Sequence, residues 1–148
     1  MMELSSAEAL EQLGVRIAAL VRQGDVIALS GDLGAGKTTL ARGILAGLGL
    51  RGEAPSPTFT LVQSYGPPEL RLPVCHADLY RLESPAESLE LGLEEAQDQG
   101  LVLIEWPERL GDWLSPHALW LRLEGAPGPM RRLTARVPQA WEGRWPPR

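Results

Sequence analysis

The segment Gly31–Thr38 reads GDLGAGKT and matches the pattern G-x-x-x-x-G-K-S/T at every fixed position. A short apolar run, Val26–Ser30, precedes it, and helically spaced apolar residues follow from Lys37 to Leu48. Glycines in such a turn let successive backbone N–H groups point at phosphate oxygens, and the positive end of the following helix faces the same anion. The sequence therefore predicts a phosphate-binding loop between a strand and a helix.

Two side chains at the end of this loop fit the chemistry of a triphosphate. Lys37 is a point charge able to reach the β- and γ-phosphates, and the Thr38 hydroxyl suits Mg²⁺, which prefers oxygen ligands. Glycine accounts for 16 of 148 residues, so stray glycine pairs are expected, but a complete match followed by Lys-Thr is specific. We expect binding of a nucleoside triphosphate, ATP with Mg²⁺, and its hydrolysis.

Hydrolysis also needs acidic groups for the metal and for water. Leu101–Glu105 is four apolar residues ending on an acid, the form of a Walker B strand, and the C-terminal end of such a strand opens on the ligand crevice. Glu105 is therefore expected beside the metal. Asp78 also ends an apolar-leaning run and can orient the attacking water, or it is a solvated loop acid. His76, in the same run, is interpreted as a packed structural residue.

Two further residues have a functional and a structural interpretation. Ser56–Thr58 follows the nucleotide helix, where several hydrolases place a segment that senses the γ-phosphate. Thr58 can contact the metal or the γ-phosphate, or the segment is a proline-stiffened turn. Trp106, next to Glu105, is a core ring or a lid on the site, and we favour the core.

The remaining pattern predicts an α/β protein: a P-loop NTPase-like three-layer fold with a mostly parallel central sheet and an antiparallel C-terminal hairpin. Capping boxes at Ser5–Glu8 and Ser84–Glu87 start helices, the second broken at Gly92. Other expected elements are strands at Phe59–Tyr65 and Leu72–Leu79, a short helix at Pro107–Leu114, and a hairpin of Ala118–Glu124 with Arg132–Val137. We expect one domain over residues 1–137 and a loosely packed tail over 138–148.

Composition narrows the classes of protein. Cys75 is the single cysteine, which excludes an internal disulfide and a cysteine-built zinc site. No stretch approaches the roughly 20 apolar residues of a membrane span, and the first residues lack a secretory pattern, so we expect a cytoplasmic protein without membrane contact. The net charge of −5 argues against a stand-alone nucleic-acid binder. It leaves open a protein that works on nucleic acid through a partner.

Four segments resemble the TsaE family, also called YjeE, in their order and spacing. They are GDLGAGKTT at Gly31–Thr39, SPTFTLV at Ser56–Val62, HADLYRL at His76–Leu82 and LIEWPERL at Leu103–Leu110. The resemblance covers about Ser5 to Val137. It implies a small bacterial P-loop ATPase of tRNA threonylcarbamoyladenosine synthesis, weak alone and stimulated by its partners TsaD and TsaB. The modified adenosine lies beside the anticodon in tRNAs reading codons that begin with A, and tRNA would be met only through the complex.

The resemblance also implies roles for particular residues. The Mg²⁺ ligands would be Thr38 and Glu105, and the catalytic groups Lys37, Asp78 and Glu105. The phosphates would be held by Gly34, Ala35, Gly36, Lys37, Thr38 and Thr39, with Thr58 in a switch-like segment. The start of the first helix, Ser6 and Ala7, would approach the adenine. The C-terminal hairpin would bring Arg131 or Arg132 to the nucleotide, and we take Arg132 as the candidate.

Two other functions remain open. The first is a small-molecule kinase built on the same loop, although Leu89–Gln97 is acidic and has no Arg or Lys for a phosphate-clamping lid. The second is a binding module whose affinity for a partner depends on the bound nucleotide, with hydrolysis incidental. No arginine finger can be named from the sequence, and a partner can supply one.

Overall fold

The protein is described by a computed structural model, which covers residues 2–32, 34–52, 62–125 and 128–147. One seven-stranded sheet runs through it in the order β1-β7-β6-β2-β5-β4-β3. The strands are β1 (Met2–Leu4), β2 (Val26–Ser30), β3 (Val62–Tyr65), β4 (Val74–Asp78), β5 (Leu101–Glu105), β6 (Leu119–Gly125) and β7 (Arg131–Arg136). The four central strands β6, β2, β5 and β4 are parallel, and antiparallel strands flank them on both sides.

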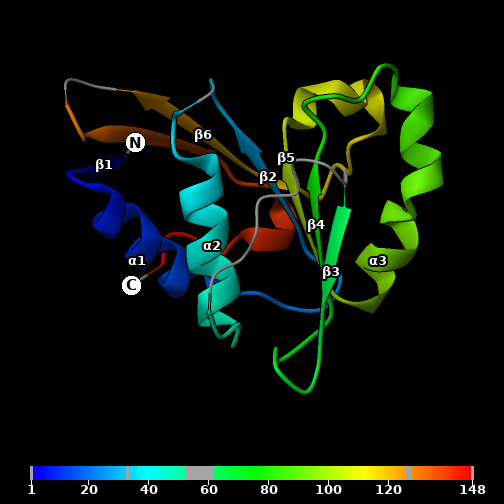
Figure 1. Ribbon diagram of the computed structural model, residues 1–148, viewed down its shortest axis with the longest axis horizontal. Helices are drawn as coiled ribbons and strands as arrows, with labels where there is room; N and C mark the ends of the chain where they lie inside the picture. The colour runs from blue at the N-terminus through cyan, green and yellow to red at the C-terminus, as the bar shows by residue number, and fades with distance from the viewer. Residues whose placement is uncertain (1, 33, 53–61, 126–127, 148) are drawn as a thin grey trace.

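Helices cover both faces of the sheet, giving three layers (Figure 1). On one face lie α1 (Ala7–Ala18) and α2 (Lys37–Gly47), and on the other α3 (Leu93–Gln99) with the 3₁₀ helices η1 (Pro85–Leu91) and η2 (Pro107–Trp113). Alternate residues of β2 and β5 enter separate apolar clusters: Ile27 and Leu103 join the first, Ala28 and Ile104 the second. Burial on both faces explains why these strands are continuously apolar. No helix in the described ranges is long and apolar enough to cross a membrane.

The predicted fold class is confirmed, and β2 and β5 have their predicted bounds. The predicted helix break falls at Gly92, whose φ of 70° lies in the left-handed region. Three details of the helices and strands were wrong. Ser84 is the N-cap of η1, but its side chain makes no capping hydrogen bond, so the predicted capping box is not formed. The N-cap of α1 is Ser6, not Ser5, since the Ser6 hydroxyl accepts the N–H of Ala9 at 3.1 Å. The short edge strand β1 was not predicted, because three residues carry too little periodicity.

The helices α1 and α2 cross so closely that the start of α1 is fixed beside the glycine-rich loop. A Cβ at Gly43 on α2 would lie 2.1 Å from the carbonyl oxygen of Glu11 on α1, so only glycine fits there. At the other end of the contact, a Cβ at Gly36 would lie 2.5 Å from the side chain of Leu10. Close packing of the two helices therefore fixes the position of α1 relative to the loop.

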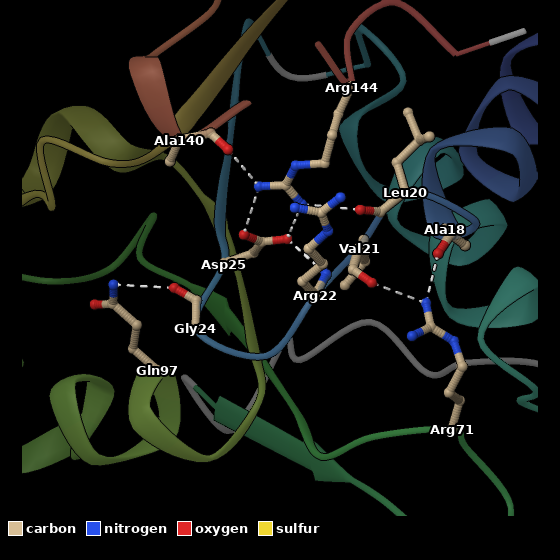
Figure 2. A network of polar contacts seen from close by, with 10 residues as sticks. All are labelled: Ala18, Leu20, Val21, Arg22, Gly24, Asp25, Arg71, Gln97, Ala140 and Arg144. Carbon is tan, nitrogen blue, oxygen red and sulfur yellow. Dashed lines mark hydrogen bonds and ion pairs between the residues drawn. The ribbon is translucent and has the colours of Figure 1, made fainter. Parts of the chain in front are cut away.

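Residues 138–147 of the C-terminal tail pack around a buried ion pair, in contrast to the loose packing expected for residues 138–148. Trp141, in the 3₁₀ helix η3 (Gln139–Trp141), is fully buried, and the Arg144 guanidinium lies 4.0 Å above its ring. Arg144 binds Asp25 with two hydrogen bonds of 2.7 and 3.0 Å, while Asp25 also accepts the N–H of Arg22 (Figure 2). Composition alone could not reveal that Arg144 pairs with Asp25, which is distant in sequence.

We predict that Arg144→Ala lowers the free energy of unfolding by about 3–5 kcal/mol, because it leaves the buried Asp25 carboxylate without its counter-charge. Both side chains of this pair are at most 9% exposed. The matched control is Arg122→Ala, whose pair with Glu124 is 63% and 57% exposed and contributes no more than about 1 kcal/mol. Urea denaturation measures both changes. Equal, small losses in the two variants would contradict the structural role of Arg144.

Candidate nucleotide-binding site

The glycine-rich loop connects the C-terminal end of β2 to the first turn of α2. Gly31 has a φ of 141°, and a Cβ there would lie 2.4 Å from the carbonyl oxygen of Leu123. Gly36, the N-cap residue of α2, has a φ of 107°, which non-glycine residues rarely adopt. The loop therefore lies close to β6 and leads directly into α2, whose first backbone N–H groups have no partner within the helix. This arrangement is suited to binding an anion.

Lys37, the first residue of α2, is buried and turned back onto its own loop. Its ammonium group donates hydrogen bonds to the carbonyl oxygens of Gly31 and, at 3.2 Å, Asp32. The same nitrogen lies 3.9 Å from the centre of the Trp106 ring, a cation–π contact. Burial lowers the pKa of Lys37, and nearby carboxylates, Glu105 foremost, oppose that shift. Lys37 is therefore a partly desolvated cation whose charged form is stabilised by nearby negative charge.

The end of β5 brings Glu105 against the first turn of α2. Glu105 is 2% exposed, and its Oε1 accepts the hydroxyl of Thr38 at 3.1 Å. Its other oxygen, Oε2, lies 2.6 Å from Nε2 of His76 on β4. Strand pairing places Asp78 of β4 directly beside Glu105. Four side chains from a loop-helix junction and two parallel strands therefore meet at one edge of the sheet.

Asp78 is half-buried and carries the second acid of the site. Its Oδ1 accepts the backbone N–H of Tyr80 at 3.1 Å. Burial raises the pKa of Asp78, the Tyr80 hydrogen bond opposes this, and the neighbouring Glu105 adds to it. A carboxylate with a raised pKa is well matched to accepting a proton from water.

The structure brings most of the predicted phosphate and metal residues together. Gly34, Ala35, Gly36, Lys37, Thr38 and Thr39 form the loop and the first turn of α2, opposite Glu105 and Asp78. Ser6 and Ala7 lie at the start of α1, which packs beside this loop through Leu10, although the Ser6 hydroxyl is engaged as the helix cap. Thr58 lies outside the described residues.

The two arginines of the C-terminal hairpin lie differently. Arg131 donates to the carbonyl oxygen of Gly34 in the loop at 3.4 Å, and also to that of Met130 at 2.8 Å. Arg132, the predicted candidate, instead lies 3.9 Å from Glu3 of β1 and is exposed. Neighbouring residues of a strand face opposite sides, so only one of the two can face the loop. In this conformation it is Arg131.

Sequence reasoning undervalued two residues of the site. His76, interpreted as structural, is bonded to Glu105, and Trp106, favoured as a core ring, both packs on the second apolar cluster and lies against Lys37. A signal was available for His76. It precedes Asp78 by two residues, so alternation places both side chains on the same face of β4.

The donor set fits Mg²⁺. The Thr38 hydroxyl and the Glu105 carboxylate are oxygen donors 3.1 Å apart, and this ion commonly takes one or two protein oxygens while phosphates and waters fill the other positions. Across the described ranges, no group of three or more His, Cys, Asp or Glu side chains could hold a metal by itself.

A strand–glycine loop–helix unit beside a parallel strand that ends on an acid defines a P-loop NTPase fold. The family model described as "Threonylcarbamoyl adenosine biosynthesis protein TsaE" matches residues 4–133, and the chain belongs to this family. The family is named for its part in tRNA threonylcarbamoyladenosine biosynthesis, which confirms the resemblance seen in the four sequence segments.

Curated relatives cover most of the chain. The protein named tRNA threonylcarbamoyladenosine biosynthesis protein TsaE in Streptomyces coelicolor is 40% identical over 120 residues, covering 80% of this chain and 81% of the relative. Its namesake in Bacillus subtilis is 41% identical over 118 residues, covering 79% and 72%. The crystal structure of Bacillus subtilis YdiB superposes with a TM-score of 0.76 at 32% identity, covering 90% of this chain and 82% of that one.

We predict that Asp78→Asn raises the melting temperature of the nucleotide-free protein at neutral pH. Because the folded-state pKa of Asp78 is raised, the folded protein binds this proton more readily than the unfolded chain, so ionisation destabilises the fold as pH rises through the raised pKa. Asn keeps the acceptor for Tyr80. Calorimetric scans from pH 4 to 8 should show the gain shrinking as the pH falls. A gain that is absent, or that grows toward low pH, contradicts the raised pKa.

Proposed function

We propose that this protein binds ATP with Mg²⁺ through Gly34–Thr39 and hydrolyses it as a component of tRNA threonylcarbamoyladenosine synthesis. The observation that carries the proposal is the hydrogen bond from Thr38 to Glu105, which joins two segments 67 residues apart into one candidate metal site. Family membership supports the proposed role in this pathway, and the fold supports the proposed binding of a nucleotide. TsaD and TsaB are the proposed partners, the cytoplasm the proposed location, and tRNA is met only through the complex.

In this mechanism the loop amides and Lys37 bind the β- and γ-phosphates. Lys37 exchanges the carbonyl oxygens of Gly31 and Asp32 for phosphate oxygens and stabilises the charge that develops on them. Thr38 and Glu105 would hold Mg²⁺, which would supply positive charge to the phosphates. Asp78 orients the attacking water and takes its proton as the new oxygen–phosphorus bond forms and the bond to the β-phosphate oxygen breaks.

Three further contacts belong to the proposal. Ser6 and Ala7, at the start of α1, are the proposed adenine contacts, and Thr58 is the proposed γ-phosphate sensor. Of the hairpin arginines, Arg132 was the candidate for the nucleotide, but the contact of Arg131 with Gly34 supports Arg131 as the better one. We propose that a partner supplies the arginine finger, which would explain weak activity in isolation.

We predict that Lys37→Ala lowers ATP turnover by at least about 100-fold, since one preorganised donor to developing charge contributes on the order of 10²–10³. Phosphate release from ATP alone is the assay, because a kinase would need an acceptor to turn over. Arg122→Ala, which removes an exposed side chain of β6 that pairs with Glu124, is the control and should retain wild-type activity. Wild-type release by the Lys37 variant would overturn the proposed site.

We predict that Glu105→Gln still binds ATP but hydrolyses it at least about 100-fold more slowly, because the amide keeps an oxygen for Thr38 and loses the negative charge for the ion. Reconstituted tRNA modification with TsaD and TsaB then separates two functions. If hydrolysis is the function, this variant supports no more than a single round. Sustained modification by the variant would instead identify a nucleotide-dependent binding module.

A further inference from the structure

We propose that His76 is a positioning residue that orients the Glu105 carboxylate and thereby sets how strongly Mg²⁺ tightens nucleotide binding. The inference rests on the proposed function, because it concerns the same candidate metal site. It assigns to His76 a role in placing a metal ligand, in contrast to the packing role that its sequence context favoured.

The first observation is the geometry of the Glu105 carboxylate. One oxygen, Oε1, accepts the Thr38 hydroxyl at 3.1 Å, and the other, Oε2, lies 2.6 Å from Nε2 of His76. An ionised carboxylate only accepts hydrogen bonds, so the imidazole donates from Nε2. With both oxygens engaged from opposite partners, rotation of the carboxylate is blocked, and Oε1 stays on the side of Thr38.

The second observation is burial. His76 is 1% and Glu105 2% exposed, so bulk water does not reach this pair in the intact protein. A buried acceptor without a partner costs about 1–3 kcal/mol, more when it is charged. The carboxylate would then turn to find another donor. Since the Thr38 contact uses the same rigid group, turning would also misplace Oε1.

The third observation is that His76 makes its polar contact with Glu105 alone. Its other ring nitrogen, Nδ1, is buried and has no hydrogen-bond partner in the described part of the chain. If this position served only core packing, an apolar side chain of similar size would be more stable than histidine, because it has no unpaired ring nitrogen to bury. The polar ring is explained by its bond to Glu105.

The reach of the side chain is also specific. Strand register places His76 opposite Leu103, two residues before Glu105, so the contact runs diagonally between β4 and β5. Nε2, at the far end of the imidazole, spans this offset. Glutamine carries an N–H donor at a similar distance from its backbone, whereas the amide of asparagine ends near the position of Nδ1. The two amides therefore differ in whether they can reach Glu105.

The test measures binding of a non-hydrolysable ATP analogue by calorimetry, with Mg²⁺ and separately with EDTA. In wild type we expect Mg²⁺ to tighten binding. In His76→Leu we expect this Mg²⁺-dependent tightening to fall about 10–100-fold, as for other groups that orient metal ligands, while the affinity in EDTA changes less than about twofold. His76→Gln should restore the tightening, and His76→Asn should not.

Each failure has a distinct signature. If wild type binds the analogue in neither condition, the proposed function fails before the inference is reached. If wild type binds and all His76 variants keep the full Mg²⁺ effect, or lose affinity equally with EDTA, the positioning role is overturned. Should the leucine variant fail to fold, the comparison of His76→Gln with His76→Asn decides, and equal Mg²⁺ effects in these two overturn it.

A double-mutant cycle gives an independent check. With Glu105→Ala, no carboxylate remains to be oriented, so adding His76→Asn should change the Mg²⁺ effect by less than about twofold. A further loss of the Mg²⁺ effect as large as in the single variant would show that His76 acts through some other group, and would overturn the inference.

Discussion

The parallel pairing of β2 with β5 is the constraint on which the site depends. Leu29, near the end of β2, is opposite Glu105, so the loop that follows β2 and the acid that ends β5 must emerge at the same edge of the sheet. This strand register allows the Thr38 hydroxyl to donate a hydrogen bond to the Glu105 carboxylate. A shift of β5 by one residue would turn Glu105 to the other face, away from α2. The apolar layers on both faces oppose such a shift, because every residue of β2 and β5 is buried.

The site concentrates charge where the rest of the fold avoids it. Lys37 and Glu105 are among the few buried charged residues of the described chain, and the burial that makes Lys37 easier to deprotonate makes Asp78 harder to ionise. Burial disfavours the charged forms of both groups, and in the proposed function a triphosphate with a divalent ion would offset this cost. At the opposite end of β2, by contrast, Asp25 has its counter-charge in Arg144 built into the chain. One end of the strand is stabilised internally, and the other is left to bind.

The sequence predicted the parts of the site whose signals are local. The loop, β2 and β5 follow from fixed residue spacing and from strands buried on both faces. Partners distant in sequence could not be predicted: Asp25 and Arg144 are 119 residues apart, and the tail looked unstructured because composition does not reveal what a Trp or Arg will meet. The choice between Arg131 and Arg132 depends on which face of β7 points to the loop, and an error of one residue in register reverses it. His76 was placed on the right strand but was weighed as a lone histidine.

Trp106 connects these points, because it follows Glu105 in the chain and its ring lies against the Lys37 ammonium. Its φ of 61° is the one positive value among the described non-glycine residues, a conformation that costs on the order of 1–3 kcal/mol unless the surroundings impose it. That turn directly after Glu105 sets the ring against the Lys37 ammonium and 5.0 Å from the ring of Tyr80. A phosphate must therefore compete with one aromatic face and two loop carbonyls for the same cation. If the proposed function holds, the net free energy of nucleotide binding at Lys37 is the difference between these interactions, so Trp106 would influence affinity together with the loop.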